Sequence, residues 1–499
     1  MGKQLSRRDF LKLGLAVAAM AAFRPLPGTE MRQIAETFAY NPQSQVTPPD
    51  SNNARKYSPL TLLAANRLTF GARQSDLDWI ERNGVDAFIE EQLAFDQIDD
   101  SVVNQRLQNF STLNLLPTDP APTDESNVLL ELQGATLLRA VYSQRQLYEL
   151  IVDFWSNHFN VHFNSPSDYI LKTIDDRDVV RKYGMSKFRD LLGASAHSPA
   201  MLVSLNNSLS VKKQPNENYA RELMEQHTIG VDGDFTEKDV AEVARSFTGW
   251  MVEQFIYKKP IVGTFNYLAA NHDEDPKVVL GHRLPAYGGV KDGEKVLDIL
   301  ASTPACAALI STKLVQRFIS DNPPASAVQK GMDAFQSSQG DIRATLGAIL
   351  HSQEFKSSTG LKVKRPLDYA VSALRALNAE TDAGRPIQSF ILRLGQPLFL
   401  WPLPDGYPDT AEDWVNSGGM LARWNFAKAL VGNSINGTHI ELKGLASQTG
   451  NMIEDLSQAI LFGSLPSDMV GALNLLTDPK KMPELAALLI ASPFFQVRG

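Results

Sequence analysis

Apolar residues recur at the three- and four-residue spacing of amphipathic helices along most of the chain after residue 58. Alternation typical of strands occurs at residues 263–268 and 277–280, which a turn separates and which predict one small β-hairpin. The spacing predicts helices over residues 58–67, 75–83, 85–95, 128–159 (one long helix or two joined ones), 185–197, 216–228, 236–248, 292–301, 307–320, 342–351, 366–376, 420–430 and 483–491. The predicted fold class is mostly α: one large multi-helix domain with a small β-hairpin insertion.

Two further patterns mark places where this helical periodicity starts or stops. Thr236 and Asp239 have the spacing of a capping box ahead of an apolar run, which predicts a helix start. Residues 398–409 are rich in Pro and Trp and predict an ordered excursion between helical regions, with a candidate subdomain break there.

The first 23 residues have the anatomy of a secretory signal. Residues 6–12 read Ser-Arg-Arg-Asp-Phe-Leu-Lys, a twin-arginine motif, and a weakly apolar stretch rich in Ala and Gly follows. Ala19-Met20-Ala21 offers a small-x-small cleavage site, and the apolar stretch is too short for a stable membrane anchor. The alternative is a cytoplasmic amphipathic helix, which leaves the complete motif at the very start of the chain unexplained. We therefore expect export by the twin-arginine translocase to the periplasm or the extracellular space.

Composition then narrows the classes of partner. The chain carries a net charge of −8, and cleavage after Ala21 removes four basic residues and one acidic residue, which leaves the mature chain near −11. An acidic protein does not neutralise phosphates, so we expect no nucleic-acid partner. Residues 24–57 are polar and predict a disordered linker ahead of a helical domain over residues 58–499. That domain has no apolar run long enough to cross a membrane, so we expect no stable membrane insertion.

A single cysteine limits what can stabilise the exported chain. Cys306 excludes an internal disulfide, a four-cysteine iron–sulfur cluster and a c-type haem site. The fold must therefore rest on its hydrophobic core.

The predicted helix that ends near residue 159 carries two histidines four positions apart. On a helical wheel His158 and His162 share the apolar face with Trp155, whereas Asp153 and Asn157 lie opposite. Two neutral imidazoles at this spacing can bind one metal ion, and Trp155 is a candidate for substrate binding. The alternatives are two hydrogen-bonded buried histidines, or a helix that ends before His162.

The predicted helix over residues 216–228 has one strongly polar face. Asn218, Arg221, Glu222 and Glu225 share this face, and Asn216 precedes them. If the face lines a cleft, the two glutamates can hold a cation or transfer protons, Arg221 can bind an anionic group, and the two asparagines can contact substrate. The alternative is a solvated helix face with an ordinary charge pair.

Residues 271–273, Asn-His-Asp, lie between the two predicted strands. His272 beside Asp273 suits either a hydrogen-bonded turn or a catalytic pair, because turns hold structural and functional aspartates alike. The sequence contains no G-x-S-x-G elbow, phosphate-binding P-loop or dinucleotide glycine fingerprint.

Seven short stretches, in order, resemble the bacterial protein family catalogued as domain of unknown function 1800. They are residues 66–71 (NRLTFG), 154–159 (FWSNHF), 197–202 (HSPAML), 215–225 (PNENYARELME), 244–250 (ARSFTGW), 272–273 (HD) and 492–496 (SPFFQ). The resemblance implies an exported, mainly helical protein without a settled biochemical role. It also implies a partner, since genes of this family often lie beside those of a second exported family that is related to sulfatases.

The chain departs from that family pattern in two places. After Glu225 the family continues with Leu and an aromatic residue, where this chain has Gln226 and His227. His162 lies outside the family motif, which leaves His158 as the better candidate for a metal ligand.

Two hypotheses about function follow. The first is an exported enzyme, with or without a divalent metal, that acts on an extracytoplasmic polymer or its fragments. Its candidate catalytic residues are His158, Glu222, Glu225, His272 and Asp273, and its candidate metal ligands are His158, His162 and Glu222. The second is a non-catalytic partner that binds a neighbouring exported enzyme or a surface polymer. Convergence of His158, Glu222 and Asp273 in one concave site would favour the enzyme.

Export is expected to depend on the arginine pair. Replacing Arg7 and Arg8 with Lys keeps the charge but removes the twin-arginine motif, so the protein should remain in the cytoplasm. Cell fractionation with an antibody against the mature chain measures this, and an undiminished periplasmic fraction would count against the twin-arginine route.

Overall fold

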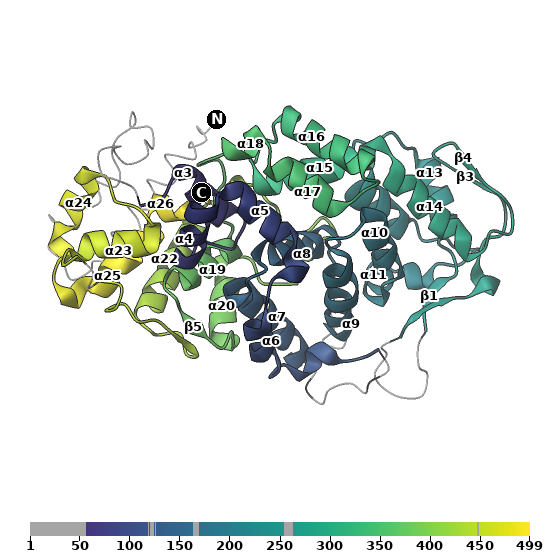
Figure 1. Cartoon of the computed structure of the whole chain (residues 1–499). Coiled ribbons are helices and arrows are strands. Elements are labelled where there is room, and N and C mark those ends of the chain that lie inside the picture. Colours follow the sequence, from purple (N-terminus) through teal and green to yellow (C-terminus); the bar gives the residue numbers. More distant parts are fainter. Residues whose placement is uncertain are drawn as a thin grey trace, which may run out of the picture.

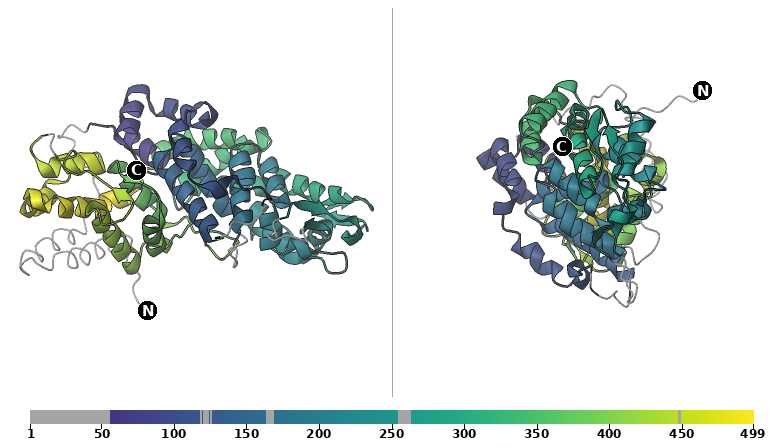
Figure 2. Two further views of the ribbon diagram at one scale, coloured as in Figure 1. Left: turned by 90° about the horizontal axis from the view of Figure 1, so that it is seen from below. Right: turned by 90° about the vertical axis from the view of Figure 1, so that its right-hand side faces the viewer.

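The computed structural model describes residues 56–499 except 118, 120–123, 125, 163–168, 254–262 and 447–448. The signal peptide and nearly all of the predicted linker lie outside the described residues. The described chain is mainly helical and elongated, with α23–α25 at one end and the strands β3 and β4 at the other (Figures 1 and 2). The predicted mostly-α fold class is confirmed.

The α-helices cover most of the predicted ranges. Their bounds are α3 Pro59–Arg67, α4 Gln74–Asn83, α5 Val85–Leu93, α6 Ser101–Leu107, α7 Ser126–Tyr142, α8 Gln146–His158, α9 Tyr169–Asp175, α10 Phe188–His197, α11 Pro199–Ser204, α12 Glu217–Glu222, α13 Glu237–Ser246, α14 Val290–Ser302, α15 Pro304–Phe318, α16 Ala325–Ser337, α17 Ile342–Leu350, α18 Gln353–Lys356, α19 Pro366–Ala376, α20 Arg385–Leu394, α21 Ala411–Trp414, α22 Ser417–Val431, α23 Met452–Leu461, α24 Ser467–Leu473, α25 Met482–Ala491 and α26 Pro493–Gln496. Two π-helical segments, η4 Asp176–Arg181 and η6 Leu223–Thr228, continue from α9 and α12.

Helix starts follow the sequence signals where these are present. Thr236 caps α13 as predicted: its side chain accepts from the Asp239 amide, and the Asp239 carboxylate accepts from the Thr236 amide. The predicted helix over 128–159 is two helices, because the chain leaves the helical conformation between Tyr142 and Gln146.

The strands correct the predicted hairpin. Residues 265–267 (β2) pair with Trp250–Val252 (β1), and Lys277–Val279 (β3) pairs with His282–Leu284 (β4). Leu280 and Gly281, between β3 and β4, have φ angles of 47° and 78°, the positive values that a two-residue type I′ hairpin turn requires. The two predicted strands therefore lie in separate two-stranded sheets, and the tight turn that follows Val279 determines the pairing. A third short pair joins β5 (Glu380–Thr381) to β6 (Thr438–His439).

The two ends of the helical domain lie side by side. Arg67, at the end of α3, donates to the carbonyl of Arg498, and its Nη1 donates to the carbonyls of Phe318 and Ile319 at the end of α15. A buried guanidinium thus satisfies carbonyl groups that a helix C-terminus leaves without intrahelical partners. Burial lowers the pKa of Arg67 to about 9.

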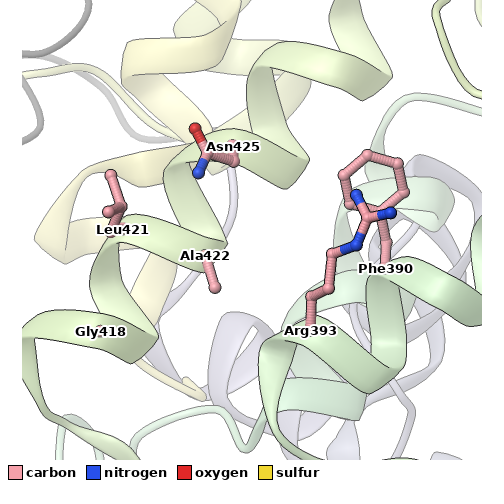
Figure 3. Close-up of a pocket in the computed structure, with 6 residues that line it drawn as sticks. All are labelled: Phe390, Arg393, Gly418, Leu421, Ala422 and Asn425. Carbon is pink, nitrogen blue, oxygen red and sulfur yellow. The ribbon is translucent and has the colours of Figure 1, made fainter.

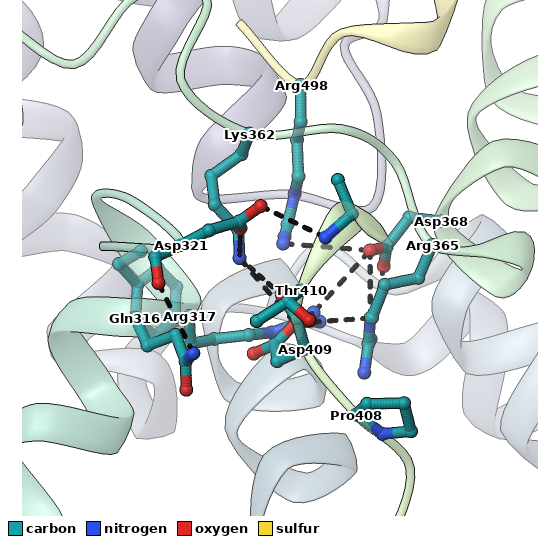
Figure 4. A network of polar contacts seen from close by, with 12 residues as sticks. Gln316, Arg317, Asp321, Lys362, Arg365, Asp368, Pro408, Asp409, Thr410 and Arg498 are labelled. Carbon is teal, nitrogen blue, oxygen red and sulfur yellow. Dashed lines mark hydrogen bonds and ion pairs between the residues drawn. The ribbon is translucent and has the colours of Figure 1, made fainter. Parts of the chain in front are cut away.

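A buried ionic network joins α15, α19 and the excursion over residues 398–409 (Figure 4), and Asp153 connects α8 to the same network. Arg317 of α15 pairs with Asp153 of α8 at 3.2 Å, with Asp409 of the excursion at 3.2 Å and with Asp368 of α19 at 3.5 Å. Arg365 binds Asp153 at 2.6 Å and Asp368 at 3.1 Å. Burial alone would raise the pKa of Asp368, but the neighbouring guanidinium groups outweigh it and hold this pKa well below its usual range.

The excursion is fixed to α8 by asparagine side chains. Asn157 donates to the carbonyl of Tyr407 at 2.7 Å and accepts from its amide at 2.6 Å. Asn160 donates to the carbonyls of Trp401 and Leu403. Between them, Gly406 has a φ of 74°, and a Cβ there would lie 2.2 Å from the Asn157 carbonyl, so this close crossing requires glycine. The subdomain break predicted in this segment stays a prediction.

Within the described residues, no single helix has the length and apolar character needed to cross a membrane, although α14 and α15, bent by 63° where they meet, reach those limits as a pair.

The buried network should dominate local stability. Asp368→Asn leaves buried guanidinium groups without their shared carboxylate, and we expect a loss of about 3–5 kcal/mol in the free energy of unfolding at pH 7. Because the folded-state pKa of Asp368 is lowered, its stabilisation is complete above about pH 4 and decreases as the pH falls toward the folded-state pKa, so the difference from wild type should shrink in acid.

Asp298→Asn is the matched control for this measurement. Asp298 pairs with Arg189 at 2.8 Å but its side chain is 51% exposed, so we expect a loss below about 1 kcal/mol. Urea titrations of both variants at pH 7 and pH 3 compare them. Equal losses at pH 7 would mean that the network contributes no more than a surface pair.

Candidate functional site

His158 is the last residue of α8 and is buried. Phe159, which caps the helix, has φ −99° and ψ 54° and turns the chain out of the helical path. His162 therefore lies beyond α8, where its backbone amide donates to the Ser204 hydroxyl. The prediction that His158 and His162 share one helical face is wrong for this reason.

Both ring nitrogens of His158 are engaged. Nε2 lies 3.1 Å from the carbonyl oxygen of His227, and Nδ1 lies 3.2 Å from Nζ of Lys313. A carbonyl oxygen can only accept, so Nε2 carries the proton and donates. Nδ1 is then the acceptor and receives a hydrogen bond from Lys313. Burial, reinforced by the Lys313 charge, lowers the pKa of His158 well below its usual value, which keeps the ring neutral.

This arrangement does not fit a metal site at His158. A metal ligand must offer a free nitrogen lone pair, whereas Nε2 of His158 is protonated and Nδ1 accepts from an amine. In the part of the chain that the structure describes, no three His, Cys, Asp or Glu side chains gather in a group that could hold a metal ion.

The helix α12 and the π-helical segment η6 carry the polar motif over residues 216–228. Asn216 caps α12 by accepting from the backbone amides of Asn218 and Tyr219. Arg221 binds Glu237 bidentately, at 2.9 and 2.6 Å, and lies 3.5 Å from Glu225. The predicted cluster of one guanidinium and carboxylates is thus present, but the main partner of Arg221 comes from α13.

Glu222 lies half-buried at the junction of α12 and η6. Its Oε2 atom is buried and has no hydrogen-bond partner among the described residues. Burial is the main cause that raises the pKa of Glu222, and the nearby carboxylates of Glu225 and Asp405 raise it further. An unpartnered carboxyl with a raised pKa is the property expected of a proton donor.

The π-helical segment brings its carbonyl groups toward α8 and α15. The wide π turn leaves backbone groups at residues 226 and 227 available, and π-helical turns are frequent at functional sites. The carbonyl of His227 accepts from His158, and the carbonyl of Gln226 accepts from Lys313 at 3.2 Å. Burial lowers the pKa of the His227 ring itself to about 3.

Lys313 of α15 completes the site. Its two hydrogen-bond partners, His158 Nδ1 and the Gln226 carbonyl, are neutral, and no carboxylate of the described residues lies within ion-pair distance of its amine. Burial lowers the pKa of Lys313 to about 8, although the charge of Asp405 opposes this effect. Such a half-buried amine exchanges its proton close to neutral pH.

The same three elements build the ionic network and the site above it. In α8, Asn157 follows Asp153 by one helical turn; in α15, Lys313 precedes Arg317 by one turn. In the excursion, Asp405 precedes Asp409 by four residues. The ion pairs of Arg317 with Asp153 and Asp409 therefore hold the segments that carry His158, Lys313 and Asp405.

His272 and Asp273 lie in a second cluster and do not form a pair with each other. The ring of the fully buried His272 faces the Thr248 carbonyl at 2.7 Å and the Asp292 carboxylate at 3.2 Å. Asp273 binds Arg245 at 2.8 and 3.0 Å. Lys277 also binds Asp292, at 2.7 Å. These contacts fasten the turn after β2 to α13 and α14.

Of the candidates from the sequence, the structure brings together His158 and the helix of Glu222 and Glu225, but Asp273 binds Arg245 in the second cluster, so the three residues do not converge in one site. Trp155 is fully buried and donates to the Gly184 carbonyl, so its indole reaches no solvent. Asn218 is exposed, and Asn216 serves as a helix cap.

The sequence reasoning missed Lys313 and Asp405. The signals available were weak: Lys313 is one lysine on a predicted helix, four residues before Arg317, and Asp405 is one acid in the Pro- and Trp-rich excursion.

Two shallow grooves border α22 at the far end of the molecule. Figure 3 shows the first, of about 390 Å³, which is lined by Phe390 and Arg393 of α20 and by Leu421, Ala422 and Asn425 of α22. The second, of about 380 Å³, lies between α22 and α25. Neither groove is lined by Lys313, His158 or Glu222, so we place the candidate site at Lys313.

Comparison with known proteins gives a family and an export signal. The family model described as "Protein of unknown function (DUF1800)" matches residues 63–497. The model of the "TAT (twin-arginine translocation) pathway signal sequence" matches residues 4–23. No curated protein and no solved structure matches the chain.

The neutral buried histidines should make stability depend on pH. Below about pH 6.5 an unfolded histidine binds a proton that the buried His227 does not accept until about pH 3. The free energy of unfolding should therefore fall by about 1.4 kcal/mol per pH unit from this residue as the pH decreases from 6.5. Urea titrations at pH 7, 6 and 5 measure the slope.

His227→Phe removes the titrating ring and keeps an aromatic side chain, so its slope should be shallower than that of wild type. His351→Ala, which removes a partly exposed histidine beside Asp86 and Glu90, is the control. Parallel slopes for wild type and His227→Phe would show that His227 is protonated in the folded state.

Proposed function

The chain belongs to the family described as Protein of unknown function (DUF1800) and carries a signal that implies export across the cytoplasmic membrane; from this premise we propose that it is an extracytoplasmic enzyme that performs acid–base chemistry on a polymer or its fragments. Lys313 is the proton acceptor, Glu222 is the proton donor, and His158 is a positioning residue.

The surroundings of Lys313 are the observation that carries this proposal. Of the fully buried lysines in the described chain, Lys172, Lys277 and Lys362 bind carboxylates, whereas Lys364 lies over the ring of Phe495. Lys313 instead meets neutral acceptors, and its pKa of about 8 leaves a useful fraction of the amine unprotonated near neutral pH. An ion pair would hold the proton on the amine and remove its capacity to act as a base.

Glu222 complements this base. Its raised pKa increases the fraction of the carboxyl that keeps its proton, and its unpartnered Oε2 leaves one oxygen for a ligand. An acid and a base whose environments shift their pKa values toward neutrality form the pairing that acid–base catalysis uses. Arg221 binds Glu237 at 2.6 Å and lies 3.5 Å from Glu225.

His158 acts through Lys313. Its protonated Nε2 is tied to the η6 carbonyl, which orients Nδ1 toward the amine. The proposal includes no metal step, because His158 has no free nitrogen to bind one. His162, His272 and Asp273 take no part in it.

A non-catalytic role remains the second proposal: binding of a neighbouring exported enzyme, such as a co-encoded sulfatase-related protein, or of a surface polymer. The grooves beside α22 favour it, because Leu421 is 43% exposed there and apolar grooves suit partner side chains. In that case Lys313 would not act as a base. The pH at which its amine reacts with an acylating reagent therefore distinguishes the two proposals.

The reactivity of Lys313 tests the enzyme proposal without a known substrate. Brief acetylation between pH 6 and 10, followed by mass spectrometry, should give a labelling midpoint near pH 8 for Lys313, because labelling requires the neutral amine. The exposed Lys238 is the reference. Lys364, whose pKa burial lowers to about 7, is 4% exposed and should stay unlabelled, which separates a low pKa from access.

A midpoint for Lys313 near the usual value of about 10.4 would contradict the proposed base. Glu222→Gln tests the acid: because Oε2 has no partner to lose, the free energy of unfolding should change by less than about 1 kcal/mol. Glu149→Gln, which disrupts contacts of 3.0 Å from both carboxylate oxygens to Arg181, should lose about 3–5 kcal/mol. A similar loss in Glu222→Gln would make Glu222 structural.

A further inference from the structure

We infer that the ligand of the Lys313 site is a glycan without acidic groups, which stacks on Trp401 and donates hydroxyl hydrogen bonds to Asp405 and Glu222. This inference rests on the proposed function and names its substrate class. It depends on the charge around the site, on the balance of donors and acceptors there, and on the placement of one indole ring.

The charge around the site is negative. The charge of Asp405 acts on both Lys313 and Glu222, and the carboxylate of Glu225 acts on Glu222 as well. The nearby cation, Arg221, is bound to Glu237 of α13 at 2.6 Å. A polyanion that approached this site would meet more carboxylates than free cations, so electrostatics disfavours acidic polymers.

Acceptors outnumber donors in the same place. Glu222 has a buried oxygen with no partner among the described residues, and Asp405 accepts one hydrogen bond from the Trp401 indole at 2.8 Å, which leaves its second oxygen for a ligand. The amide groups of Asn157 and Asn160 are already bonded to carbonyls of the excursion. A ligand rich in hydroxyl groups supplies several donors and matches this surplus of acceptors.

Trp401 offers a flat apolar surface beside these acceptors. The ring is partly exposed, its indole N–H is fixed by Asp405, and the Tyr407 ring lies 4.8 Å away between centroids. Tyr407 is itself held, because its hydroxyl donates to the Pro397 carbonyl at 2.6 Å. A preoriented aromatic face next to carboxylates suits the C–H face and the hydroxyl edge of a sugar ring.

A peptide fits this site less well. Peptide recognition commonly uses an unpaired strand edge, or pockets that receive alternate side chains, and a peptide backbone has equal numbers of donors and acceptors. The described residues around Lys313 come from α8, α12, α15, η6 and the excursion, and none of these is a strand. The observations therefore favour a glycan.

Calorimetric binding to the mature exported protein tests the inference. The probes are cellohexaose, maltohexaose and the hexamer of N-acetylglucosamine as neutral glycans, the glucosamine hexamer as an amine-bearing glycan, hexagalacturonate as an acidic one, and a neutral Gly-Ser hexapeptide. At least one neutral or amine-bearing hexamer should bind, and hexagalacturonate should bind at least tenfold more weakly. Which of these hexamers binds distinguishes neutral from amine-bearing ligands.

Variants locate the binding. Trp401→Ala should weaken the bound hexamer by about tenfold or more, because the stacking surface is lost. Asp405→Asn should weaken that hexamer and reduce the discrimination against hexagalacturonate, because it removes a negative charge. Tyr287→Ala is the matched control: this ring is 80% exposed beside β4, and its removal should leave binding unchanged.

The results separate the two levels of the proposal. If hexagalacturonate or the hexapeptide binds most tightly, if none of the sugar hexamers binds, or if Trp401→Ala binds like wild type, the inference about the ligand is wrong; a Lys313 labelling midpoint near pH 8 would then still support the enzyme. If a neutral hexamer binds through Trp401 while Lys313 labels as an ordinary lysine, the site is a glycan-binding site without the proposed base.

Discussion

The ion pairs of Arg317 fix the relation between segments that are far apart in the sequence. One guanidinium meets carboxylates from α8, α19 and the excursion, and Arg365 shares all three of those carboxylates. A buried charge without its partner is strongly destabilising, so each segment is held to the position that completes the network. Arg498 lies 3.7 Å from Asp368 and donates to backbone carbonyls near the end of α3, which links the same centre to both ends of the domain.

This constraint explains why a reactive amine can sit where it does. Four residues before Arg317, α15 presents Lys313 to His158 and to the end of η6, where neutral acceptors replace carboxylates. The network holds α15 through the ion pairs of Arg317, one helical turn after Lys313. Lys313 therefore needs no ion pair of its own to keep its position. The ionic network thus supplies rigid support, and Lys313 supplies an amine without an ion pair. Functional sites require this combination of a reactive group and a rigid support.

Much of the fold could be predicted from the sequence, because apolar spacing and caps are local. Thr236 and Asp239 start α13 as expected, and most helices lie where the periodicity placed them. The predicted strand pairing failed since pairing depends on turn geometry, and the positive φ of Leu280 is not a residue preference that a sequence reveals. The shared face of His158 and His162 failed because the last turn of α8 ends at a position that no cap residue announces.

Only part of the candidate site could be predicted from the sequence, because the properties of its other residues depend on contacts between distant segments. His158 and Glu222 lie in dense polar motifs, whereas Lys313 is a lone lysine whose character comes from burial and from partners 87 and 155 residues away. His227 shows the same limit: its ring is a departure from the family pattern, yet what the site uses is its backbone carbonyl, which any residue would supply. A substitution at residue 227 can therefore change the pH dependence of stability without removing the hydrogen bond that orients His158. The wide π turn, rather than the side chain, is what brings α12, α8 and α15 together at the site.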